Sequence, residues 1–113
     1  MGVEKQVLRE GWGPTPHQGQ RVTVHCTGYG RNRDLSAKFW STKDPGQKPF
    51  EFKVGLGEVI KGWDEGVVTM KVGEVARLTC SPDYGYGVRG FPAWGIMPNS
   101  VLAFEIEVLS VAG

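Results

Sequence analysis

Apolar and polar residues alternate with a period of two along most of the chain. In the segment RVTVHCT, Val22, Val24 and Cys26 fall on one face of an extended strand, and the residues between them are polar or charged. Five segments show this pattern: residues 3–9, 21–27, 49–55, 74–80 and 101–109. Such alternation is typical of strands with one covered face and one face in water. The sequence therefore predicts five half-buried strands in an antiparallel sheet.

One short segment has helical rather than strand periodicity. In GEVIKGWDEGV the apolar residues recur at the spacing of one helix face, namely Val59, Ile60, Trp63 and Val67. Three glycines weaken this helix, because glycine costs about 1 kcal/mol relative to alanine inside a helix. We predict a helix over residues 59–65 that needs packing against the sheet to be stable. The expected fold is α+β, a curved five-stranded antiparallel sheet wrapped around this one short helix.

Residues 81–100, SPDYGYGVRGFPAWGIMPNS, have no regular period. The segment contains three prolines, four glycines and four aromatic residues. Long irregular segments in compact domains are usually functional or disordered, and this one is too aromatic to be disordered. Loops tend to lie at the surface, so Tyr86, Phe91 and Trp94 are expected to form the wall of an apolar pocket. Packing into an ordinary core is the alternative.

Length and charge narrow the classes of function. The chain has 113 residues, of which 22% are charged, and a formal net charge of +1. These values are typical of one folded domain, residues 1–113. Nucleic-acid binding is not expected because there is no basic cluster. No apolar run reaches the roughly 18–20 residues of a membrane span, and the N-terminal segment lacks the apolar core of a signal peptide. We expect a cytoplasmic protein without a membrane partner.

The familiar catalytic and cofactor motifs are missing or lack their context. GYGVRG, residues 85–90, has the glycine spacing of a dinucleotide-binding loop, but Phe91-Pro92 follows where a helix should begin. His25 and Cys26 are neighbours on a strand and point to opposite faces, so they cannot share a metal ion. No nucleophile elbow is present. Neither a metal nor a cofactor is expected, and the remaining signal is the large number of aromatic side chains.

Five motifs in order along the chain resemble one family. They are VHCTGYG, KPFEFKVGLGEVIKGWDEGV, VGEVARLT, SPDYGYG and PNSVLAFEIEVLSV. Over essentially its whole length the chain resembles the FKBP family, and KFWSTKDPG and FPAWGIMP are most similar to the small single-domain cytosolic members of green plants. These immunophilins bind macrolides such as tacrolimus and rapamycin and catalyse peptidyl-prolyl cis/trans isomerisation. The resemblance implies the same sheet-around-helix fold and this activity.

The resemblance also implies which residues form the pocket. In the family, the tryptophan at the position of Trp63 is the floor of the ligand pocket. The pocket is expected to contain Phe39, Phe50, Val59, Ile60, Trp63, Tyr86, Ile96 and Phe104. The Ile60 backbone N–H and the Tyr86 hydroxyl would donate hydrogen bonds to ligand carbonyl groups, and the Glu58 carbonyl would accept one.

Several positions depart from the family pattern. Cys26 replaces a pocket tyrosine, and Phe91 stands where many members have histidine. Trp40 replaces an aspartate that makes a polar contact with macrolides. Cys26, Trp40 and Phe91 are still expected to belong to the pocket. The loss of the aspartate puts tight tacrolimus or rapamycin binding in question more than it does isomerisation.

Isomerisation of a prolyl bond requires neither proton transfer nor a nucleophile, which agrees with the lack of catalytic motifs. Rotation is slow because it breaks amide resonance, with a barrier of roughly 18–20 kcal/mol. A dry pocket destabilises the charge-separated planar amide, and donors aimed at the twisted carbonyl favour the transition state. The residues expected to carry catalysis are Trp63, Tyr86, Phe50 and Phe104.

A non-catalytic binding module is the competing hypothesis. It would use the rim of the same pocket, with Trp40, Phe91 and Trp94 as anchors, because exposed aromatic residues tend to dominate interface energies. The expected partners are X-Pro-containing peptides or proteins and, with a macrolide bound, a drug-dependent protein partner. A monomer is expected.

The two cysteines allow two interpretations. Cys26 and Cys80 both fall on apolar-facing strand positions and can be two buried thiols, the usual state in a cytosolic chain. The alternative is a disulfide between Cys26 and Cys80, which requires Cα atoms within roughly 7 Å.

Overall fold

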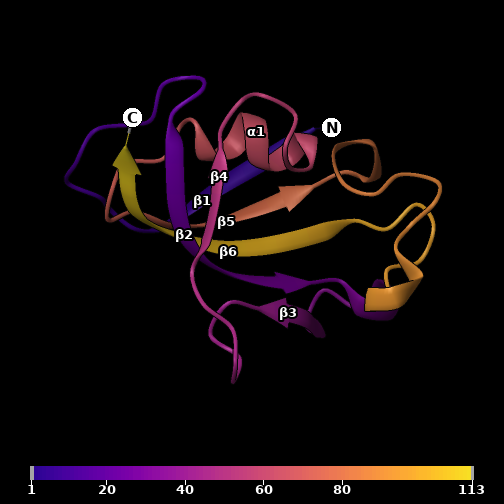
Figure 1. Ribbon diagram of the computed structural model, residues 1–113. Helices are drawn as coiled ribbons and strands as arrows, with labels where there is room; N and C mark the ends of the chain where they lie inside the picture. The colour runs from indigo at the N-terminus through magenta and orange to yellow at the C-terminus, as the bar shows by residue number, and fades with distance from the viewer. Residues whose placement is uncertain (1, 113) are drawn as a thin grey trace.

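The computed structural model describes residues 2–112. Within them, one antiparallel sheet contains β1 (Val3–Arg9), β2 (Arg21–Tyr29), β3 (Lys38–Ser41), β4 (Phe50–Lys53), β5 (Val75–Cys80) and β6 (Leu102–Ala112). The strand order is β1-β5-β6-β2-β3, and β4 also pairs with β2. The sheet curves around the helix α1 (Lys61–Val67), as Figure 1 shows. The α+β class and the wrapped-sheet arrangement predicted from the sequence are confirmed.

The sheet has one strand more than the five that alternation indicated. β2 is nine residues long, so one of its edges accommodates two partners: β4 pairs with residues 21–24 and β3 with residues 27–29. The strand missed by the pattern is β3, whose four residues KFWS are too short to show a period. Because it joins this edge, β3 brings Trp40 next to Phe50 of β4.

The core lies between the concave face of the sheet and α1. Its strand residues alternate as predicted: Val22 and Val24 of β2 and Leu78 of β5 are fully buried. β1 is an exception, because six of its seven residues are exposed. It pairs only with β5, at the edge of the sheet. The expectation that this strand is half-buried is therefore wrong.

The helix begins and ends two residues later than the range 59–65 predicted for it. Ile60 is its N-cap, and the helix buries Gly62, Trp63, Gly66 and Val67. The glycines that weaken the helix are the residues that let it approach β5. A Cβ on Gly62 would collide with the Cys80 thiol, and one on Gly66 would lie 2.7 Å from a Leu78 methyl carbon. Close packing thus stabilises a helix with poor intrinsic propensity.

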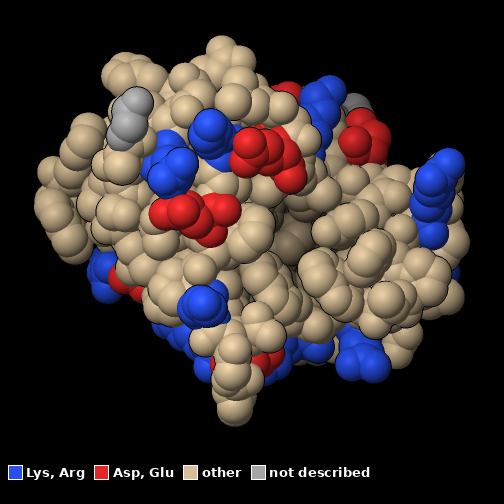
Figure 2. All heavy atoms as spheres, in the orientation of Figure 1, with Lys and Arg blue, Asp and Glu red and all other residues tan. Residues whose placement is uncertain are grey.

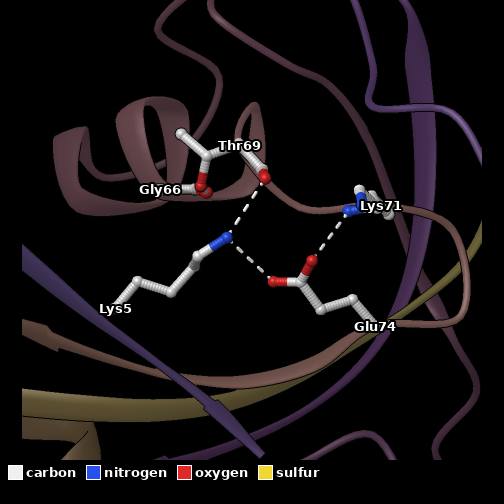
Figure 3. Close-up of polar contacts among 5 residues, drawn as sticks. All are labelled: Lys5, Gly66, Thr69, Lys71 and Glu74. Atoms are coloured by element: carbon white, nitrogen blue, oxygen red, sulfur yellow. Dashed lines mark hydrogen bonds and ion pairs between the residues drawn. The ribbon is translucent and has the colours of Figure 1, made fainter. Parts of the chain in front are cut away.

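An ion pair between the buried Glu74 and the more exposed Lys5 joins the end of α1 to the edge strand β1 (Figure 3). Lys5 Nζ lies 2.9 Å from Glu74 Oε2 and donates to the Thr69 carbonyl at 3.1 Å. The other carboxylate oxygen of Glu74 accepts the Lys71 N–H at 3.1 Å. Thr69 Oγ1 donates at 2.7 Å to the carbonyl of Gly66, which lies in the last turn of the helix. A cation near a helix C-terminus is favourable because of the helix dipole.

Residues 81–100 follow an irregular path beside the sheet. They include the 3-10 turns η2 (Pro82–Tyr84) and η3 (Pro92–Trp94) and a β-bridge between Phe91 and Ile96. A further 3-10 turn, η1 (Arg31–Arg33), contacts this segment, because the Asn32 N–H donates to the Gly95 carbonyl at 2.9 Å. Within residues 2–112, no helix has the length and apolar character needed to cross a membrane.

Candidate active site

A cavity of about 400 Å³ opens between the start of α1, the β3–β4 edge and the 81–100 segment. It is visible as the hollow in the middle of the face in Figure 2. The residues that line it are Trp40, Gln47, Phe50, Glu58, Val59, Ile60, Trp63, Tyr86, Trp94 and Phe104. Six of these ten are aromatic, so a ligand in the cavity leaves water for a largely apolar environment.

Trp63 lies at the bottom of this cavity and is 4% exposed. The first turn of α1 positions it, because the Trp63 N–H donates to the Ile60 carbonyl at 3.0 Å. Its ring meets Phe104 edge-to-face at 5.5 Å and Phe50 at 5.9 Å, and Phe52 packs beside it at 5.5 Å. Its indole N–H is buried without an acceptor among residues 2–112. Rings on three sides leave the indole little freedom to move.

Asp64 fixes the loop that carries Val59 and Ile60. Its two carboxylate oxygens each accept a backbone N–H at 2.8 Å, Oδ1 from Gly55 and Oδ2 from Gly57. Both glycines have positive φ, 79° and 78°, a conformation that glycine adopts without strain. The Asp64 N–H also donates to the Ile60 carbonyl at 3.2 Å. One residue therefore holds the loop at both ends, directly behind the pocket wall.

Removing this carboxylate is expected to lower activity more than stability. In Asp64→Ala, Gly55 and Gly57 lose their acceptor, the loop shifts, and kcat/KM should fall about tenfold, since small misplacements of binding groups reduce rates strongly. Kinetics of the expected peptidyl-prolyl isomerisation and the two glycine amide NMR resonances would report the change. The exposed neighbour provides the control, since Glu65→Ala should keep full activity. Full activity in a folded Asp64→Ala variant would refute the assignment.

Tyr86 places a hydroxyl at the edge of the cavity. The side chain is half-buried and packs against Phe91, with ring centroids 5.4 Å apart, and against Trp94 at 6.4 Å. Burial raises the pKa of the Tyr86 hydroxyl above its ordinary value of 10.0. It is therefore protonated, and able to donate a hydrogen bond, throughout the neutral and mildly alkaline range.

Trp40 and Trp94 form one wall of the cavity together. Their rings are nearly parallel, with 5° between the planes and 5.9 Å between the centroids. Trp40 also contacts Phe50 at 6.2 Å and Trp63 at 6.4 Å, and Phe91 packs edge-on to Trp94 at 4.8 Å. The stack joins β3 to η3, so the wall is continuous from the sheet edge to the irregular segment.

Nine of the thirteen residues expected to form the pocket line the cavity, and four do not. Phe39 lies behind it, stacked on Trp94 at 5.7 Å and edge-on to Phe104 at 5.9 Å. Ile96 and Cys26 are each 2% exposed and belong to the core. Phe91, 38% exposed, supports Tyr86 and Trp94 from outside. The short Cys26 side chain does not reach the cavity surface.

One lining residue was not expected. Gln47 lies in the turn between β3 and β4 and contributes a polar side chain to the rim. No periodicity or motif marks it, because its place depends on how β3 and β4 share the edge of β2. Glu58 lies at the rim, and its side chain is already engaged, since Glu58 Oε1 accepts the Lys53 N–H at 2.9 Å.

Cys26 and Cys80 are both buried free thiols. β6 lies between the two cysteine strands. Cys26 pairs in register with Ile106 of β6 and Cys80 with Leu102, so the two cysteines are also offset by four residues along β6. Two strand spacings amount to roughly 9–10 Å, which exceeds the Cα separation of a disulfide. The alternative of a disulfide is therefore not realised in this structure. Burial raises the pKa of the Cys80 thiol to about 12, which makes the thiolate form scarce.

The fold and the cavity define a class of protein. A curved antiparallel sheet around one short helix, with a tryptophan-floored aromatic pocket, is the arrangement that the sequence motifs implied. The family model "FKBP-type peptidyl-prolyl cis-trans isomerase" matches residues 13–109. The chain belongs to this family.

Individual relatives agree with the family match over nearly the whole chain. The chain is 76% identical over 109 residues to the peptidyl-prolyl cis-trans isomerase FKBP12 of Vicia faba, covering 96% of this chain and 97% of that protein. It is 74% identical over 111 residues to the protein of the same name from Arabidopsis thaliana, covering 98% and 99%. FK506-binding protein 1 of Dictyostelium discoideum is 51% identical over 97% of this chain and 98% of its own length. The predicted similarity to small plant members is confirmed.

Proposed function

We propose that this chain binds X-Pro segments in the aromatic cavity and accelerates cis/trans rotation about the X-Pro bond. One observation carries the proposal: the cavity is floored by the buried Trp63 indole, walled by aromatic rings and edged by the Tyr86 hydroxyl. The curated relatives named as peptidyl-prolyl cis-trans isomerases support it. As the acting unit we propose a single domain, residues 1–113.

The cavity lowers the barrier by favouring the twisted amide over the planar one. The planar X-Pro amide is the more charge-separated state, so water stabilises it more than it stabilises the twisted state. Transfer into an apolar cavity removes part of that ground-state stabilisation. Lowering the barrier by about 4–6 kcal/mol accelerates rotation on the order of 10³–10⁴-fold. The side chains needed for this step are rings, and no proton has to move.

Two donors at the cavity can orient the substrate carbonyl. The Ile60 N–H lies on the wall and has no acceptor within residues 2–112. The Tyr86 hydroxyl stands at the edge. In the proposed complex the proline ring lies on Trp63, and Phe50, Val59 and Phe104 enclose it. A donor fixed in a site without water stabilises a twisted carbonyl more than it would in water.

The direct test is the cis-to-trans relaxation of a short Leu-Pro peptide, measured with and without catalytic amounts of the protein. Acceleration proportional to enzyme concentration is expected. Folded protein that leaves the relaxation rate unchanged would reject catalysis and favour the binding-module hypothesis. A Trp12→Ala variant is a suitable positive control, because Trp12 is 76% exposed and lies outside the cavity.

The pH profile tests the role of the Tyr86 hydroxyl. Because burial raises its pKa above 10.0, the donor is lost only as the pH rises through that higher value. We expect kcat/KM to be constant from about pH 7 to 9 and to decline only above about pH 10. Tyr86→Phe should lower kcat/KM about fivefold to tenfold and abolish the alkaline decline. An identical alkaline decline in Tyr86→Phe would assign the titration to another group.

Macrolide binding through the same cavity is a further part of the proposal. It is supported by relatives named FK506-binding protein 1. Trp40 fills the rim with an apolar ring where the family pattern has an aspartate. Trp40→Asp is therefore expected to tighten tacrolimus binding about tenfold while isomerisation changes less than threefold. Titration calorimetry with both proteins would measure the difference. Unchanged or weaker binding by Trp40→Asp would show that Trp40 is not the obstacle.

We also propose that the protein acts as a cytoplasmic monomer on X-Pro-containing peptides or proteins. The absence of basic clusters and long apolar runs in the sequence supports this proposal. With a macrolide bound, a drug-dependent protein partner would contact the exposed rim around the cavity. Sedimentation of the free protein would test the oligomeric state, since a dimer would sediment measurably faster.

A further inference from the structure

Two arginines of η1 contact the 81–100 segment beside the cavity, and a third arginine lies on that segment. The Arg31 side chain packs over Gly95, because a Cβ added to Gly95 would lie 2.8 Å from Arg31 Cγ. Arg33 Nη2 donates to the Pro98 carbonyl at 2.6 Å. Arg89 is exposed on the same segment, beside Gly90, which packs against residues 96 and 97. Arg31, Arg33 and Arg89 are called the arginine corner below.

In the part of the chain that the structure describes, the arginines of the corner lack the carboxylate partners that other arginines have. Arg9 pairs with Glu107 at 3.0 Å, Arg21 with Glu51 at 3.8 Å, and Arg77 with Glu105 at 2.9 Å. Within residues 2–112, no carboxylate lies within ion-pair distance of Arg31, Arg33 or Arg89. All three side chains are exposed and have N–H groups available to an external anion, although one Arg33 nitrogen also binds the Pro98 carbonyl.

One carboxylate is adjacent in sequence to the arginine corner, and its hydrogen bonds do not remove its negative charge. Asp34 follows Arg33, and its Oδ1 accepts both the N–H and the hydroxyl of Ser36, at 2.9 and 2.6 Å. In Figure 2, basic side chains appear at the right and lower right, where Figure 1 places the 81–100 segment and η1. Three arginines outnumber this one carboxylate, so the local charge at this corner is positive although the net charge of the chain is only +1.

Apolar side chains accompany the arginines. Val88 is 75% exposed, Met97 40% and Phe91 38%. Guanidinium groups bind carboxylates through paired hydrogen bonds, and neighbouring apolar surface strengthens such contacts by displacing water. The corner therefore has the composition of a surface that binds an acidic peptide segment.

The arginine corner is continuous with the cavity wall. Trp94 lines the cavity, and the next residue, Gly95, is the one that Arg31 covers. An extended peptide advances about 3.3 Å per residue. A residue one to three positions from a proline held in the cavity can therefore reach the corner if the peptide leaves over Trp94.

We propose that the arginine corner selects substrates in which acidic residues flank the X-Pro bond. This inference rests on the proposed isomerase function, and it names the class of protein segment on which the enzyme acts. The carboxylates bind Arg31, Arg33 and Arg89 while the proline occupies the cavity. Because exposed ion pairs are individually weak and screened by salt, the selection is electrostatic and salt-dependent.

The test compares three Leu-Pro peptides that differ only in their flanking residues, which are glutamate, glutamine or lysine. At low ionic strength, kcat/KM should be about 3- to 10-fold higher for the glutamate peptide than for the lysine peptide, mainly through association. The difference should shrink as salt approaches about 0.5 M. Equal rates for the two peptides at low salt would overturn the proposal.

Variants locate the effect on the molecule. Arg31→Gln/Arg33→Gln/Arg89→Gln should abolish the preference for glutamate and leave the glutamine peptide within about twofold of the parent rate. A matched triple variant at exposed cations away from the corner, Arg21→Gln/Lys53→Gln/Lys71→Gln, should retain the preference. A preference that survives the corner variant would reject the assignment.

Two further comparisons separate a loss of acidic selection from a structural change and from a lack of isomerase activity. Arg33 supports the Pro98 carbonyl, so Arg31→Gln/Arg89→Gln leaves that hydrogen bond intact and should still lose most of the preference. The glutamine peptide reports the isomerase activity itself. No acceleration of the glutamine peptide by the parent protein would count against the proposed function, whereas acceleration of all three peptides at one rate would count only against acidic selection.

Discussion

Replacing Trp63 by alanine is expected to lower kcat/KM by about 100-fold. Trp63 is the floor of the cavity, and its removal opens the apolar site to water, so the planar amide is no longer destabilised. A 100-fold loss corresponds to about 2.7 kcal/mol of transition-state stabilisation. Phe104→Ala should act in the same direction, because Phe104 lines the cavity and supports the Trp63 ring edge-on. Peptide relaxation kinetics measure both.

Stability has to be separated from activity in these variants. Truncating a buried aromatic residue usually costs about 3–5 kcal/mol, which is a large part of the stability of a domain of this size. Trp63→Phe keeps a ring in the cavity and should lose only about tenfold in kcat/KM while remaining well folded. Circular dichroism confirms folding before each assay. If folded Trp63→Ala and Phe104→Ala variants both kept full activity, the catalytic site would lie elsewhere.

The second large effect concerns stability rather than catalysis. Glu74 is 3% exposed, and its carboxylate joins Lys5 of the edge strand to the Lys71 N–H beyond the end of α1. Glu74→Leu leaves the Lys71 N–H without an acceptor and Lys5 without its counter-charge. We expect a loss of about 2–4 kcal/mol in the free energy of unfolding, measured by urea denaturation.

Two comparisons identify the source of that loss. Lys5→Met should cost a similar amount, because it leaves the Glu74 carboxylate buried without a cation. The double variant should cost clearly less than the sum of the single variants. The same substitution in the more exposed pair, Glu107→Leu, should cost below about 1 kcal/mol. A Glu74→Leu protein as stable as Glu107→Leu would show that the Lys5–Glu74 pair contributes little.

Alternation predicted the central sheet because burial on one face directly imposes a period of two. Val22, Val24 and Leu78 are buried at the expected positions. Local pattern could not predict the exposure of β1, because an edge strand and a central strand can carry similar residues and differ only in their neighbours. It also missed β3, where partner geometry rather than composition decides the pairing.

Pocket residues could be predicted where the position of a residue on its helix or strand decides which way its side chain faces. Trp63 and Phe104 face the concave side of the sheet because of their positions on α1 and β6, and the motifs identified both. Cys26, Phe39 and Ile96 were assigned to the pocket by position, yet they lie behind its surface. Side-chain size and the path of the 81–100 segment decide which residues reach the cavity, and neither follows from spacing along the chain.

The parallel stack of Trp40 and Trp94 gives the protein a built-in optical reporter. Two indole rings 5.9 Å apart and 5° from parallel are close enough for their electronic transitions to couple. The near-ultraviolet circular dichroism of the chain should then depend on the mutual orientation of these two rings. Because the stack is also a wall of the cavity, a bound molecule that tilts either ring would change the spectrum without any label. Binding can therefore be followed on the unmodified protein by circular dichroism.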